Sequence, residues 1–84
     1  MRHARSDALD RLEPVLAALR AMPELTERSR GVFYCRSKAF LHFHEDEEGL
    51  FADLRTSAQF ERFRVSAAKE RSLFLQRVRA LLEG

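Results

Sequence analysis

The chain of 84 residues contains few residues that form cross-links or interrupt helices and strands: one cysteine, three glycines and two prolines. It contains no tryptophan. A single cysteine excludes an internal disulfide framework and is typical of a reducing compartment. Three separated glycines exclude a glycine-rich phosphate loop, and the sequence has no H-E-x-x-H or catalytic serine motif. We therefore predict a protein that is not an enzyme, with no catalytic residue and no bound cofactor.

Long apolar runs are also lacking. The longest, residues 15–19, is far too short to cross a bilayer, and residues 1–13 contain no apolar signal-peptide region. The sequence thus predicts a cytoplasmic protein. A chain of this length has enough residues for one hydrophobic core but not for two. We expect a loose leader over residues 1–9 and a single domain over residues 10–84.

The net charge of the chain is +2, and the charged residues are unevenly distributed along it. Residues 45–54 contain five acids and no base, whereas residues 55–84 contain seven bases and three acids. A basic C-terminal third can attract an anionic partner, although solvated helix and strand faces give the same pattern.

Apolar spacing predicts a helix at each end of the domain. Asp10 is the expected N-cap of the first helix, with Glu13 completing a capping box and Pro23 ending the helix. Ser66 is the expected N-cap of the last helix. The apolar stripe of that helix is Phe74, Leu75, Val78, Leu81 and Leu82.

After Gly31 the apolar period changes from 3.6 to 2, which indicates strands. We expect them at residues 32–35, 38–44, 50–55 and 60–65, with residues 24–30 as a polar connection. Short turns between them favour an antiparallel arrangement. The predicted fold is α+β: an antiparallel β-meander of three to four strands with N- and C-terminal helices packed on one face, in the order α-β-β-β-β-α.

Alternation along the strands predicts which side chains the helices cover. Leu41 and Phe43 should face the helices, with Phe43 opposite Leu50 across a four-residue tip at residues 45–48. If Arg36-Ser37 is a two-residue turn, Val32 and Tyr34 should also face the helices. The opposite face should then hold Phe33, Phe40, His42, His44, Phe51 and Asp53, and Cys35 would lie beside them.

Three phenylalanines on an uncovered sheet face favour protein docking or self-association, including a homodimer. Nucleic-acid binding is a second interpretation, in which Arg62 and Arg64 contact phosphates and the phenylalanines stack on bases. Metal binding is the third, because His42 and His44 two apart on a strand can reach one ion, with Asp53 as a third ligand. The acidic run at residues 45–48 lacks the alternating ligand spacing of a calcium loop.

The segments Met22-Pro23-Glu24-Leu25-Thr26-Glu27, Val32 to Phe40 and His44-Glu45-Asp46 resemble the small bacterial MmcQ/YjbR-type proteins. His42-Phe43-His44 followed by residues 49–54 is similar to the luciferase-associated domain of unknown function, which has an H-x-H…DL run. Ser37 departs from the first family, where glycine is usual. The resemblance implies a compact α+β domain with a frataxin-like or related arrangement, and it brings no catalytic residues.

These observations predict a small, non-catalytic binding or assembly module. Its expected binding residues are Phe40, His42, His44, Phe51, Asp53, Arg62 and Arg64.

Overall fold

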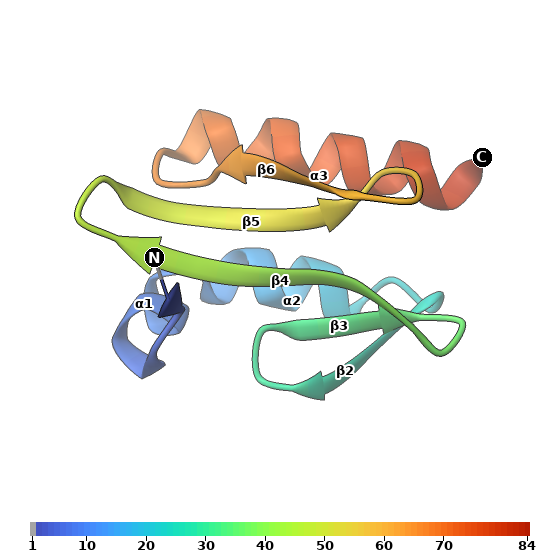
Figure 1. Ribbon diagram of the computed structural model, residues 1–84, viewed down its shortest axis with the longest axis horizontal. Coiled ribbons are helices and arrows are strands. Elements are labelled where there is room, and N and C mark those ends of the chain that lie inside the picture. The colour runs from blue at the N-terminus through green and yellow to red at the C-terminus, as the bar shows by residue number, and fades with distance from the viewer. Residues whose placement is uncertain (1) are drawn as a thin grey trace.

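The computed structural model describes residues 2–84 as an α+β fold (Figure 1). Its elements, in chain order, are β1 (Arg2–His3), α1 (Ser6–Arg11), α2 (Glu13–Arg20), β2 (Leu25–Ser29), β3 (Val32–Cys35), β4 (Lys38–Asp46), β5 (Gly49–Arg55), β6 (Phe60–Arg64) and α3 (Ala68–Glu83). The helices cover one face of the sheet, as predicted (Figure 1). We call this the inner face and the opposite one the outer face.

The sheet is an antiparallel meander in the order β2-β3-β4-β5-β6. It therefore has five strands in sequence order rather than three to four. The additional strand, β2, occupies the segment that was expected to be a polar connection. Only Leu25 is buried in β2, so this edge strand has no apolar alternation that would reveal it.

A sixth, two-residue strand comes from the N-terminus. β1 pairs with β4, where Arg2 lies opposite Glu45 and His3 opposite His44. Within the segment predicted to be a loose leader, residues 2–3 form β1, residues 6–9 belong to α1, and Leu9 is only 7% exposed. β3 pairs with β4 up to His42, so β1 continues the same edge of β4 beyond the end of β3.

The N-terminal helix is divided in two, and the predicted capping box does not form. Leu12 interrupts the helix with φ −95° and ψ 5°, between α1 and α2. Pro14 explains the break, because it has no amide hydrogen to bond the carbonyl of Asp10 and its ring crowds that carbonyl. The carboxylates of Asp10 and Glu13 instead pair with Arg30.

The inner face carries the core. Phe74 of α3 is 1% exposed, and its ring centroid lies 6.2 Å from that of Phe43 and 5.7 Å from that of Phe63. Leu41, Ala52 and other inner-face residues are fully buried. Ser66, the predicted cap of α3, instead accepts a hydrogen bond from the Leu50 amide at 2.8 Å. The N-cap of α3 is the next residue, Ala67.

A β-bulge in β4 determines which side of β3 faces the core. Cys35 pairs with Lys38 across the predicted two-residue turn, yet Phe33 pairs with Leu41, so Phe40 is an extra residue in the ladder. The bulge shifts the pairing by one residue, and this exchanges the faces of the residues beyond it. The prediction for β3 was therefore wrong: Phe33 is 1% exposed on the inner face.

The β4–β5 hairpin keeps the predicted faces with a different register. Phe43 lies opposite Ala52, not Leu50, because β4 continues to Asp46 and only Glu47 and Glu48 form the turn. The shift is an even number of residues, so every side chain stays on the predicted face.

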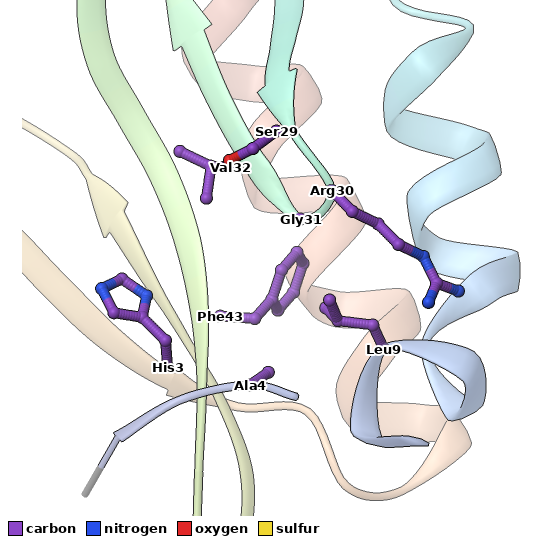
Figure 2. Close-up of a pocket in the computed structure, with 8 residues that line it drawn as sticks. All are labelled: His3, Ala4, Leu9, Ser29, Arg30, Gly31, Val32 and Phe43. Carbon is purple, nitrogen blue, oxygen red and sulfur yellow. The ribbon is translucent and has the colours of Figure 1, made fainter. Parts of the chain in front are cut away.

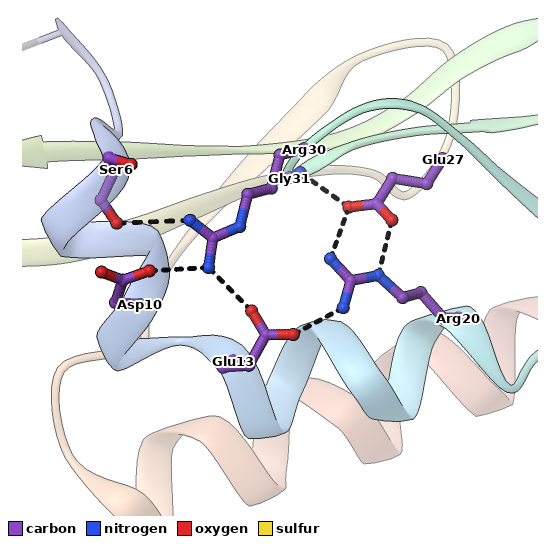
Figure 3. Close-up of polar contacts among 7 residues, drawn as sticks. All are labelled: Ser6, Asp10, Glu13, Arg20, Glu27, Arg30 and Gly31. Atoms are coloured by element: carbon purple, nitrogen blue, oxygen red, sulfur yellow. Dashed lines mark hydrogen bonds and ion pairs between the residues drawn. The ribbon is translucent and has the colours of Figure 1, made fainter.

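A polar network joins the N-terminal helices to the β2–β3 hairpin (Figure 3). Arg20 contacts Glu13 and Glu27, each at 2.6 Å, and Arg30 bonds Glu13 at 2.8 Å. Glu27 also accepts the Gly31 amide at 2.9 Å. Single exposed ion pairs contribute little to stability, so the contact of Glu27 with the hairpin backbone is the one that fixes geometry.

None of the helices over residues 2–84 combines the length and apolar character needed to span a bilayer.

Candidate metal site on the outer sheet face

The outer face of β4, β5 and β6 is built from two adjacent cross-strand rows. In the first, His42 lies opposite Asp53, and Asp53 lies opposite Arg62. The second row contains His3, His44, Phe51 and Arg64. Because side chains in one row are cross-strand neighbours, the sheet brings together six of the seven predicted binding residues.

Asp53 is the polar centre of this face. Arg62 donates two hydrogen bonds to its carboxylate, from Nε to Oδ1 at 2.8 Å and from Nη2 to Oδ2 at 2.9 Å. The paired guanidinium lowers the pKa of Asp53. Asp53 is therefore an ionised carboxylate at neutral pH, held in one orientation by Arg62.

Both β4 histidines bring Nε2 close to the same carboxylate oxygen. The distance to Asp53 Oδ2 is 3.6 Å from His42 and 3.1 Å from His44. Ligand atoms that share a tetrahedral zinc ion at about 2.0–2.1 Å lie roughly 3.3 Å apart. One ligand atom from each of the three residues falls within 4.8 Å of the other two. The spacing is thus close to that of a metal site.

His44 has no hydrogen-bonding partner among the described residues for either ring nitrogen, and both nitrogens are buried. His44 Nε2 lies 3.1 Å from Asp53 Oδ2, but the contact lacks the geometry of a hydrogen bond. An unsatisfied buried polar atom costs about 1–3 kcal/mol. A metal ion bound through a nitrogen would remove that penalty.

The pKa of His42 is lowered, chiefly because burial disfavours the charged ring and then because His44 is close. A neutral imidazole is the form that binds metal ions.

The group of exposed phenylalanines on this face is much smaller than predicted. Phe33 faces the core, and Phe40, at the bulge, is 8% exposed. Phe51 remains half-buried on the outer face, where the guanidinium of Arg64 lies 5.8 Å from its ring centroid. Phe60, which the sequence did not single out, is 38% exposed and lies 5.2 Å from the His42 ring.

The two arginines proposed for nucleic-acid contact are engaged within the protein. Arg62 is bound to Asp53, while Arg64 donates to the Glu48 carbonyl at 2.7 Å and lies 3.4 Å from Glu70. Their guanidinium groups are therefore largely directed at intramolecular partners.

Other sequence candidates do not belong to this group of ligand atoms. The bulge places Cys35 on the inner side with Phe33, half-buried against the core and away from His42. In the acidic run, Asp46 accepts the Glu48 amide at 2.8 Å within the hairpin turn. Over residues 2–84, His42, His44 and Asp53 form the one group of three with metal-ligand spacing.

His3 is a second residue of this face that the sequence did not predict. Its ring stacks on His44 with centroids 5.1 Å apart, and it lies 5.6 Å from His42. A two-residue strand is too short to produce an alternation, so the sequence carried no signal for its place.

Comparisons of the chain with protein-family models, with curated proteins and with solved structures gave no significant match. Interpretation of the site therefore rests on its geometry.

Proposed function

We propose that this chain is a small metal-binding module that holds a divalent transition-metal ion through His42, His44 and Asp53. The observation that carries the proposal is His44, whose two buried ring nitrogens have no hydrogen-bonding partner among the described residues although Nε2 lies 3.1 Å from Asp53 Oδ2. Two imidazoles and one carboxylate suit zinc and its neighbours in the first transition row.

Arg62 supports this assignment. Carboxylates that bind metal ions are usually held by a further hydrogen bond, which fixes their orientation. The Arg62 Nε bond to Oδ1 would serve this purpose, and Oδ2, which accepts Arg62 Nη2 at 2.9 Å, would use its other lone pair for the ion. In this arrangement Arg62 is a positioning residue and does not touch the ion.

Zinc titration of the purified protein by calorimetry tests the proposal. We expect one ion per chain, and a loss of affinity of about 100-fold or more in His44→Ala, which removes a direct ligand. Glu47→Gln, in the exposed turn, and Cys35→Ser, which removes the thiol, are controls expected to bind like the wild type. No binding by the wild type, or equal binding by His44→Ala, would overturn the proposal.

Self-association through the outer face stays a prediction. The partly exposed ring of Phe60 beside His42 supports a contact there. Sedimentation with and without zinc distinguishes a metal-bridged dimer from a metal-binding monomer, because a bridging ion gives one zinc per two chains.

A further inference from the structure

All three histidines of the chain meet on the outer face, although one is about forty residues from the other two. His3 arrives on β1, and His42 and His44 belong to β4. The ring centroids are 4.8 Å apart for His42 and His44, 5.1 Å for His3 and His44, and 5.6 Å for His3 and His42.

These separations match three imidazoles around one ion. When each ring nitrogen lies about 2.0–2.1 Å from a tetrahedral zinc ion, the ring centroids are roughly 5 Å apart. The rings thus form a triangle of the required size, and Asp53 lies beside it on the next strand.

We infer that His3 is a further ligand of the proposed site, so that metal binding fastens β1 to β4. The inference rests on the proposed function, because it adds a ligand to the same ion. The donor set would be three imidazoles and one carboxylate, which completes four-coordination without a ligand from outside the chain.

The backbone already holds His3 in place. His3 pairs with His44, the Ala4 amide donates to the Phe43 carbonyl at 3.1 Å, and the Arg5 amide donates to the Glu45 carboxylate at 2.7 Å. Only the ring has to turn, since its present stacking on His44 does not direct a nitrogen into the ligand cluster. The side chain is exposed, so it can rotate without displacing the core.

Open space also lies beside His3, on the side of the β2–β3 hairpin. A pocket of about 340 Å³ opens between β1 and the β2–β3 hairpin, and His3, Ala4 and Val32 contribute to its lining. In Figure 2, His3 lies on the opposite side of β4 from the rings and methyl groups of Phe43 and Leu9. Turning the ring therefore leaves the contacts on the inner face unchanged.

β1 is the element that an ion would stabilise most. A two-residue strand has few backbone hydrogen bonds, and such terminal segments open at low free-energy cost. An ion shared between β1 and β4 would require β1 to be paired, so β1 should open less often in the metal-bound protein.

Zinc affinity and amide hydrogen exchange, measured together, test the inference. For His3→Ala we expect zinc affinity to fall by at least about tenfold without being lost, since even outer-shell partners contribute that much. Asp7→Ala, an exposed substitution nearby on α1, is the matched control and should not change affinity. Zinc should slow exchange of the Ala4 amide in the wild type and in Asp7→Ala, but not in His3→Ala.

Cobalt(II) provides a spectroscopic check. The wild type should give the intense visible bands of a four-coordinate ion, and His3→Ala should give weaker bands as water enters. Copper(II) and nickel(II) are unsuitable probes, because they form square-planar complexes with histidine and backbone nitrogens independently of the fold.

The outcomes separate the two proposals. Zinc binding that needs His44 and is equal in wild type and His3→Ala would overturn the role of His3 and leave the proposed function standing. Failure of the wild type to bind zinc would remove both.

Discussion

His42 and Asp53 lie directly opposite each other on β4 and β5, with His42 Nε2 3.6 Å from Asp53 Oδ2. Arg62 occupies the next position of the same row on β6. The row therefore places a neutral ring, an anion and a cation side by side across three strands. This order makes Asp53 the residue on which the electrostatics of the outer face depend.

Asp53→Asn should lower the thermal unfolding midpoint of the metal-free protein. The amide keeps the shape of the side chain but cannot accept both guanidinium hydrogen bonds of Arg62 as a carboxylate does. Glu61→Gln is the matched control, because Glu61 neighbours Arg62 in β6 and has only a 3.9 Å contact with Arg77. Differential scanning calorimetry checks the prediction, and equal midpoints for the two variants would contradict it.

Phe74→Ala should destabilise the protein by about 3–5 kcal/mol, since it leaves a cavity between α3 and the sheet. A loss of this size is a large part of the stability of a small domain, which is typically about 5–15 kcal/mol. Leu73→Ala, one residue away and 54% exposed, should change stability by less than about 0.5 kcal/mol. Chemical denaturation measures both; similar losses would show that α3 does not pack as described.

Gly31→Ala should cost about 1–3 kcal/mol. Gly31 has φ +81°, and an added Cβ would lie 2.7 Å from Leu9 Cδ2. The strain therefore has a backbone part and a packing part. Gly84→Ala, where the nearest atom is 3.5 Å away, is the control. In a Leu9→Ala background, Gly31→Ala should cost only the backbone part, and no cost in that background would show that the backbone conformation is unimportant.

Stability should fall in acid partly through Glu27. Its hydrogen bonds from Arg20 lower the pKa of Glu27 in the folded protein. The unfolded chain then takes up a proton at a higher pH than the folded protein does. The contribution of Glu27 is thus complete above about pH 4.3, the ordinary glutamate value, and is lost as the pH falls through the lower folded value.

Urea denaturation between neutral and acidic pH tests this. Glu27→Gln should be less stable than the wild type at neutral pH, with the difference shrinking in acid. Glu13 also has a lowered pKa through Arg30 and Arg20, so the wild type retains some acid sensitivity without Glu27. A constant difference between wild type and Glu27→Gln across the range would contradict the prediction.

The two-residue period of the central strands was sufficient to predict the α+β class, the helices on one face and the outward position of His42 and His44. Alternation could predict these features because one buried sheet face dictates the spacing of apolar residues. The same reasoning correctly placed Asp53 on the outer face, where the cross-strand register brings it beside Arg62.

The features that sequence reasoning missed are ones that leave no periodic pattern. A single extra residue at Phe40 reverses the faces of β3, yet the local residues look the same with or without a bulge. β2 is an edge strand of mainly polar residues, and β1 is too short for any pattern. His3 could not be predicted as part of the site, because its place depends on a pairing with residues 44–45.

The pairing of β1 with β4 also has a kinetic consequence. Most of the sheet consists of hairpins between consecutive strands, which close short loops at small entropic cost, whereas the Arg5–Glu45 contact joins residues 40 apart. We expect the N-terminal segment to dock after the meander has formed. Pulse-labelling of amide protons during refolding should then find Ala4 protected later than the β4–β5 ladder, and simultaneous protection would show that the sheet forms in one step.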